Sequence, residues 1–249
     1  MIKLEKTNVT GWEAAIRGMR NPMNSWDKSD SQIFQHIDGL EIGSNDLKLM
    51  NSLAMAGTSH SKYRRMIIVT VDITAPLYWW KEFDTYKVGT VANSCSTMHK
   101  IHAKEFTFSD FSCDHLIASY EYSFDEDKIV STDYLDTYCG LDYGTLEPID
   151  YGGGTMEFDV FPIDILNWTI VMLNRARDLY LKTKDKKYWW QMIQLLPSSY
   201  NQKRTVQLNY EVLANIYATR KDHKLDEWRN FCEWIESLPY ARSLITMEE

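Results

Sequence analysis

The feature that most constrains the fold is a short run of β-branched and apolar residues, MIIVTVDI at positions 66–73. Such side chains crowd the turns of a helix and pack well in a sheet, so this run predicts a strand. Pro76 follows closely, and its fixed φ suits the first turn of a helix. We therefore expect Pro76 to begin a helix through LYWWKEFDTYK.

Several further stretches carry apolar residues at helical spacing. They predict helices over residues 11–20, from a cap at Asn45-Asp46 to Gly57, over 163–181, through 189–196, over 206–220 and over 225–238. The predicted fold class is α+β, mostly helical with a small sheet, in a single domain spanning residues 1–249.

Charge is distributed unevenly along the chain. The net charge is −8, but residues 105–165 hold 15 acidic residues against one base, Lys128, and the remaining body is mildly basic. The overall acidity argues against a protein that coats nucleic acid, whereas a basic body suits small phosphorylated ligands. Because Tyr, Asp and Gly follow one another irregularly in 105–165, we expect this segment to be an exposed acidic insertion.

Composition excludes other classes of protein. Hydrophobic residues make up 44% and charged residues 25%, which is typical of a globular protein rather than a disordered chain. No apolar run approaches the roughly 18 to 20 residues of a membrane helix, and the N-terminus has no apolar signal core, so we expect a cytoplasmic protein without a membrane partner. The cysteines lack zinc-type spacing, which predicts reduced thiols and no metal site: Cys95, Cys113, Cys139 and Cys232.

Candidate chemistry is distributed rather than local. No hydrolase, kinase, metalloprotease or dinucleotide-binding signature is present. Two stretches, residues 81–102 and 209–229, hold more polar groups than a buried helix needs.

At these stretches the sequence resembles the flavin-dependent thymidylate synthases (ThyX). The resemblance lies in the order and spacing of NDLKLMNSLAMAGTSH, KYRRMIIVTVDITAPLYWW and KEFDTYKVGTVANSC, then of LLP at 195–197 and LNYEVLANIYATR at 208–220. It covers residues 45–103 and 165–230. The resemblance implies the ThyX fold, a homotetramer or at least a dimer, FAD as cofactor, and NADPH and methylenetetrahydrofolate as co-substrates. The implied reaction is methylation of dUMP, or a close pyrimidine nucleotide, at C5.

Carried over position by position, the resemblance assigns two sets of residues. Those expected at the flavin are His60, Tyr86, Asn209, Asn215 and Lys224. Those expected at the nucleotide are Glu82, Lys87, Thr90, Asn93, Cys95 and Arg220.

The family's RHRx7S motif is rewritten in this chain. Its three basic positions are Thr85, Tyr86 and Lys87, its Ser is Cys95, and the Arg that follows is Thr97. Replacing Arg by Thr removes bidentate donors for a phosphate. The flavin side is therefore predicted to be kept and the nucleotide side to be changed.

Two other functions remain open on the sequence alone. A related flavoenzyme could make a different modified pyrimidine, with Glu82, Asn93 and Cys95 setting the substrate. A non-catalytic descendant could bind a nucleotide, or bind a protein through the acidic segment. Structural roles also remain open, because Arg220 at a helix end complements the helix dipole and Cys95 is more readily a small buried residue than a nucleophile.

Overall fold

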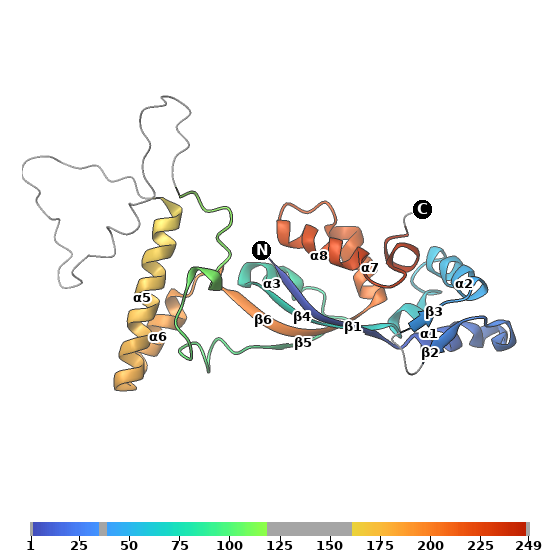
Figure 1. The fold of residues 1–249 in the computed structure, drawn as a ribbon, viewed down its shortest axis with the longest axis horizontal. Helices are drawn as coiled ribbons and strands as arrows, with labels where there is room; N and C mark the ends of the chain where they lie inside the picture. The colour runs from blue at the N-terminus through green and yellow to red at the C-terminus, as the bar shows by residue number, and fades with distance from the viewer. Residues whose placement is uncertain (1, 35–38, 119–160, 248–249) are drawn as a thin grey trace, which may run out of the picture.

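The computed structural model describes residues 2–34, 39–118 and 161–247. Its centre is an antiparallel sheet in the order β1 (Lys3–Thr10), β4 (Ile68–Pro76), β6 (Asn201–Asn209) and β5 (Val91–Ser94). One face of this sheet is covered by α3 (Leu77–Phe83), α7 (Tyr210–Arg220) and α8 (Asp226–Glu236), as Figure 1 shows. The α+β prediction is confirmed.

The strand predicted at 66–73 is confirmed as β4, which begins and ends slightly later. Every second residue from Val69 to Ala75 is fully buried, so β4 presents one apolar face to the covering helices. That face packs on an aromatic core in which Trp79 of α3 and Trp228 of α8 have ring centroids 4.7 Å apart.

The N-terminal helices α1 (Trp12–Arg20) and α2 (Ser44–Met55) confirm the predictions for 11–20 and 45–57. A short hairpin of β2 (Gln32–Phe34) and β3 (Gly39–Glu41) lies between them in sequence. A buried ion pair joins the two helices, with Arg20 Nε 2.6 Å from Asp46 Oδ1. Asp46 also accepts hydrogen bonds from Ser29 and Ser31, so its buried charge is fully satisfied.

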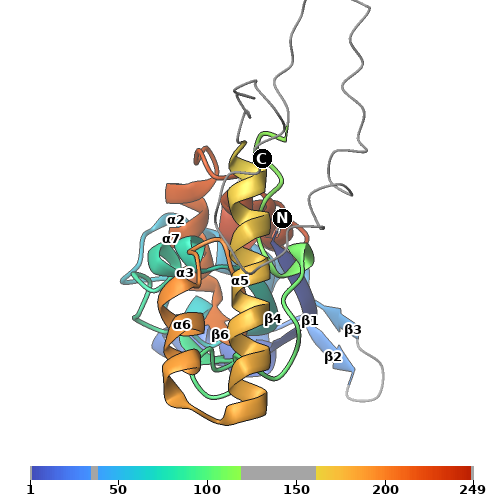
Figure 2. The ribbon, with the colours of Figure 1, turned by 90° about the vertical axis from the view of Figure 1, so that its left-hand side faces the viewer.

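The helices α5 (Pro162–Thr183) and α6 (Lys186–Leu195) form a hairpin at one end of the molecule, side by side in Figure 2. They confirm the predictions for 163–181 and 189–196. A second apolar cluster fills the space between them and residues 101–111, with Leu173 and Met192 fully buried. Phe106 and Phe111 belong to this cluster, so the beginning of the predicted acidic insertion is packed rather than exposed. Most of that segment, residues 119–160, lies outside the described residues.

The helix predicted over 206–220 is wrong in its first part. Val206 and Leu208 are buried while Gln207 between them is exposed, and the three pair with β4 as part of β6. Their apolar spacing fits both a strand and the following helix, and pairing with β4 decides for the strand. The helix itself begins only at Tyr210.

Other boundaries also differ from the predictions. Pro76 is the last residue of β4, and α3 runs from Leu77 only to Phe83, not to Lys87. The helix predicted over 225–238 is confirmed as α8. Of the strands in the described residues, only β4 was predicted as a strand. The two edge strands of the main sheet carry little apolar signal, because β1 is polar and all four residues of β5 are exposed.

Candidate functional site

Arg220, at the end of α7, is the centre of a cluster that joins three helices. Its Nη1 donates to Oε2 of Glu82 on α3 at 2.7 Å, and its guanidinium lies 4.7 Å from the ring centroid of Trp228 on α8. Trp228 Nε1 donates to the same Glu82 oxygen at 2.9 Å, and His223 Nε2 lies 3.6 Å from it. The structure therefore brings the predicted residues Glu82 and Arg220 into direct contact.

The hydrogen bonds around Tyr86 run in one direction. Arg220 Nε donates to the Tyr86 hydroxyl at 2.8 Å, and that hydroxyl lies 2.9 Å from Thr219 Oγ1. Because the Thr219 hydroxyl donates its own proton to the backbone carbonyls of Asn215 and Ile216, its oxygen accepts the proton of Tyr86. Tyr86, predicted at the flavin, is thus tied to the nucleotide set through Arg220.

The residues predicted at the flavin lie along α7. His60 precedes Ser61, whose hydroxyl donates to Glu211 in the first turn of the helix. Asn209 precedes the helix, Asn215 lies within it, and Lys224 follows its end. Since α7 has 11 residues, the two ends of this helix lie about 16 Å apart.

Asn209 has a structural role in addition to its predicted one. It is 8% exposed, and its Oδ1 accepts a hydrogen bond from the backbone N–H of Val212 at 3.0 Å, which caps α7. The expectation that Asn209 and Asn215 share one helix is wrong, because Asn209 ends β6. Asn215 is exposed.

The loop between α3 and β5 approaches Asn209 closely. Gly89, in this loop, has a φ of +80°, and a Cβ there would lie 2.8 Å from Asn209 Nδ2.

 Gly11, in the turn from β1 to α1, has a φ of +87°, and a Cβ there would meet the carbonyl oxygen of Met66. Both positions therefore require glycine. Next to Gly89, Thr90 Oγ1 is buried and has no hydrogen-bond partner among the described residues.

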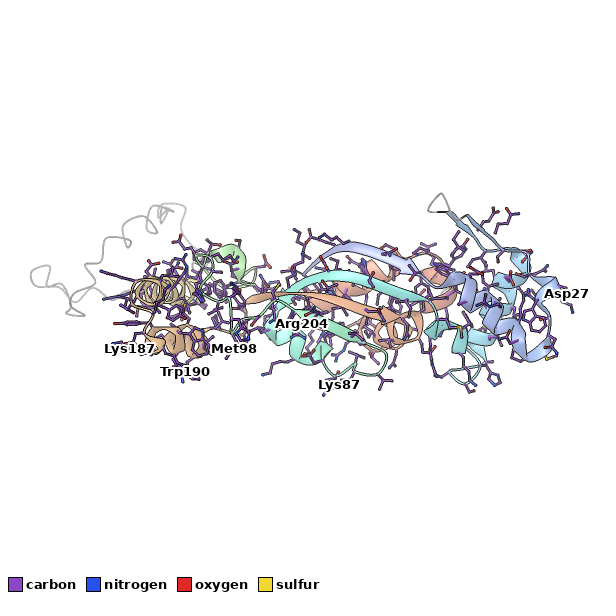
Figure 3. All side chains as sticks on the ribbon, turned by 90° about the horizontal axis from the view of Figure 1, so that it is seen from below. Asp27, Lys87, Met98, Lys187, Trp190 and Arg204 are labelled. Carbon is purple, nitrogen blue, oxygen red and sulfur yellow. The ribbon has the colours of Figure 1, made fainter. Side chains whose placement is uncertain are left out.

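The rest of the predicted nucleotide set lies on or near β5. Lys87 is exposed in the loop, where Figure 3 labels it, and its ammonium makes no ion pair with any described residue. Asn93 is exposed on β5 and pairs in register with Thr205. These residues follow one another along a single segment, from α3 to the end of β5.

Cys95 corrects one expectation. It follows β5, an edge strand, and is exposed rather than buried. Its backbone is fixed, because its N–H donates to the Lys203 carbonyl at 2.9 Å and its carbonyl accepts from Gln202 Nε2 at 2.9 Å. Cys95 and Lys203 line a polar cavity of about 250 Å³ with Lys104 and Asp110, which contact each other.

A second contact holds α3 and α8 together beside the Arg220 cluster. The Tyr78 hydroxyl, on α3, donates to the buried carboxylate of Glu227 on α8, and it lies 3.0 Å from Ser112 Oγ. Burial, and then the Glu227 carboxylate, raise the pKa of Tyr78. Tyr78 therefore stays neutral and holds Ser112 against both helices.

Sequence reasoning did not single out Trp228, His223 or Thr219. All three lie in the polar stretch 209–229, which was the available signal. Their partners Glu82 and Tyr86 lie more than 130 residues away, so only the fold reveals the contacts.

Two general features of the described residues bear on the site. No group of three or more His, Cys, Asp or Glu side chains in the described ranges is placed to hold a metal ion. Among the helices of residues 2–34, 39–118 and 161–247, none has the length and hydrophobicity needed to cross a bilayer.

The fold of this chain is similar to that of ThyX-like proteins. The structure of thymidylate synthase X (ThyX) from Helicobacter pylori with FAD and dUMP matches with a TM-score of 0.60 at 15% identity, covering 99% of this chain and 98% of that one. A UMP/dUMP methylase, PolB from Streptomyces cacaoi, bound with 5-Br dUMP, matches with a TM-score of 0.55 at 14% identity, covering 99% and 94%. No protein-family model and no curated protein matches the sequence. The chain therefore has a ThyX-like fold.

Proposed function

We propose that this chain is a flavin-dependent enzyme of the ThyX kind that modifies a pyrimidine nucleotide at C5. In its specific form, the proposal is methylation of dUMP with methylenetetrahydrofolate as the one-carbon donor and NADPH as the reductant. The observation that carries it is the likeness of fold, over nearly the whole length of both chains, to a thymidylate synthase crystallised with FAD and dUMP.

The side chains along α7 fit a flavin. His60, Asn215 and Lys224 are exposed, and their side chains make no hydrogen bond or ion pair with any described residue. An imidazole, an amide and an ammonium suit the polar ring edge and the phosphates of FAD. Asn209 would hold the first turn of α7 in place and offer its Nδ2 to the ring. When bound, reduced FAD supplies the hydride equivalent.

The nucleotide side supports a second candidate, a flavoenzyme that makes a different modified pyrimidine. Arg220 is paired with Glu82, and Thr85 and Thr97 stand where the resemblance expects arginines. In the proposal, Lys87 and Thr90 would contact the nucleotide from the loop, and Asn93 and Cys95 from β5. Such a set provides fewer cations for a phosphate than the ThyX motif does.

A homotetramer is part of the proposal, since one chain would supply only part of each site. The hairpin end of the molecule supports association. Ile165, Trp168 and Met172 lie at helical spacing on α5 and are 41–51% exposed. An exposed apolar stripe of this kind is typical of a surface that another chain covers.

The test is the absorbance of the purified protein at about 450 nm, where oxidised flavin absorbs, with and without added FAD and dUMP. We expect a flavin spectrum, and we expect Lys224→Ala to weaken FAD binding. Lys182→Ala, an exposed lysine at the far end of α5, is the matched control and should not change it. If no absorbance at about 450 nm stays with the protein after FAD is added and unbound FAD is removed by gel filtration, the flavoenzyme is refuted and the non-catalytic descendant is favoured. Rescue of a thymidine-requiring host would support dUMP methylation over a different modified pyrimidine.

A further inference from the structure

Arg220, in the site, and Arg204, beside it, are neutralised in the same way. Arg220 pairs with Glu82, and Arg204 on β6 pairs with Asp84 at the end of α3, each through Nη1 at 2.7 Å. Each guanidinium also lies over a buried indole, Arg220 over Trp228 at 4.7 Å and Arg204 over Trp80 at 4.1 Å. Neither arginine therefore presents a full uncompensated charge to a ligand.

Arg220 nevertheless keeps one donor group available. Its Nε is used by Tyr86 and its Nη1 by Glu82, whereas its Nη2 makes no hydrogen bond with any described residue. Its side chain is 19% exposed and that of Glu82 is 36% exposed, so a ligand can reach both. A group that binds Nη2 must then lie close to the Glu82 carboxylate.

We propose that Glu82 is a selectivity residue that makes Arg220 a donor for an uncharged oxygen and disfavours a dianionic phosphate. This inference rests on the proposed function, because it names the part of a pyrimidine nucleoside that Arg220 binds: a ring carbonyl or a sugar hydroxyl. A neutral oxygen gains a hydrogen bond from Nη2 and is little affected by the carboxylate. A phosphate at the same place meets the repulsion of Glu82, which offsets the attraction of Arg220.

Glu82→Gln separates charge from shape. The glutamine keeps an oxygen that can accept from Arg220 and from Trp228, so the cluster can stay assembled, but the negative charge is gone. Asp84→Asn is the matched control, because it makes the same change on the neighbouring pair with Arg204. Thermal melting of all three proteins shows whether the fold is retained.

The experiment is isothermal titration calorimetry of the FAD-saturated protein with 2′-deoxyuridine and with dUMP. We expect native protein to bind the two ligands within about threefold of each other. Glu82→Gln should bind dUMP roughly tenfold more tightly, as expected for removal of one nearby charge at intermediate dielectric, with deoxyuridine changed less than about threefold. Asp84→Asn should change neither affinity by more than about threefold.

The outcomes separate this inference from the proposed function. If neither ligand binds native protein or either variant, the proposed function fails and the inference fails with it. If deoxyuridine binds but Glu82→Gln leaves dUMP affinity unchanged or weaker, the inference alone is wrong. It is equally wrong if Asp84→Asn strengthens dUMP binding as much, because the effect would then be general electrostatics rather than selectivity at Arg220.

Discussion

Asn209 combines a contact that the structure shows with a flavin contact that we propose, and substitution can separate the two. Its Oδ1 caps α7 through the N–H of Val212 at 3.0 Å. Replacing a capping Asn by Ala costs about 1 kcal/mol, whereas Ser caps nearly as well as Asn. Asn209→Ala should therefore lose about 1 kcal/mol of stability, and Asn209→Ser much less.

For a chain of this length, 1 kcal/mol corresponds to a fall in Tm of about 2 to 4 °C. We expect that fall for Asn209→Ala and a fall of less than about 2 °C for Asn209→Ser, measured by differential scanning fluorimetry or circular dichroism without added FAD. FAD affinity, measured by fluorescence titration of the same proteins, should fall in both variants, because neither carries the amide Nδ2.

Two results would contradict this reasoning. If Asn209→Ser melts as early as Asn209→Ala, capping of α7 is not what Asn209 contributes to stability. If Asn209→Ser binds FAD as tightly as native protein, the residue only caps the helix and its place in the flavin set is wrong.

Two further predictions concern Asp46, which lies outside the site, and Cys95, which is compared with the buried Cys232. Burial opposes ionisation of Asp46, but hydrogen bonds from Ser31, Ser29 and Arg20 lower its pKa, so its contribution to stability is present above pH of about 4 and is lost on acidification. Urea unfolding at neutral pH should show Asp46→Asn to be about 3 kcal/mol less stable than native protein. Between about pH 5 and pH 3 the free energy of unfolding of Asp46→Asn should fall less than that of native protein, and an equal fall would contradict this prediction. Cys95 is exposed, whereas burial raises the pKa of the Cys232 thiol to about 12. Brief alkylation at about pH 8, followed by peptide mapping, should therefore modify Cys95 in the folded protein and Cys232 only in urea. Early labelling of Cys232 in folded protein would show that α8 opens more readily than its packing indicates.

The helices were predictable where one apolar stripe meets one core. Trp12, Ala15, Ile16 and Met19 are all buried on α1, so a single period describes them. The end of β6 was not predictable in the same way, because Val206 and Leu208 continue the spacing of α7 in the sequence. Only the register with Val71 and Val69 of β4 shows that they belong to a strand.

Edge strands were missed for the opposite reason. The sequence KLEKTNVT of β1 has little apolar character, because an edge strand with much of its surface in water needs few apolar residues. The exposure of Cys95 has the same origin, since β5 is the other edge of the sheet. A small side chain such as that of Cys95 suits both a buried position and an exposed position at a sheet edge. The sequence alone does not distinguish these two positions.

The candidate site was predictable as two sets of residues but not as a network. The resemblance placed Glu82 and Arg220 in one set, yet it gave no sign that they bond to each other or that Trp228 supports both. Their roles toward flavin and nucleotide remain predictions.

The two arginine pairs show how the rewritten motif is accommodated. Glu82 and Asp84 come from the same end of α3, and each reaches an arginine more than 100 residues away, on α7 and β6 respectively. An unpaired arginine beside Trp228 or Trp80 would be partly desolvated without compensation, and the acid removes that cost. The same acids lower the attraction for a phosphate. The stability of the cluster and its proposed preference for an uncharged oxygen therefore have one cause, so a variant that keeps the hydrogen bonds but removes the charge should change ligand choice more than it changes the fold.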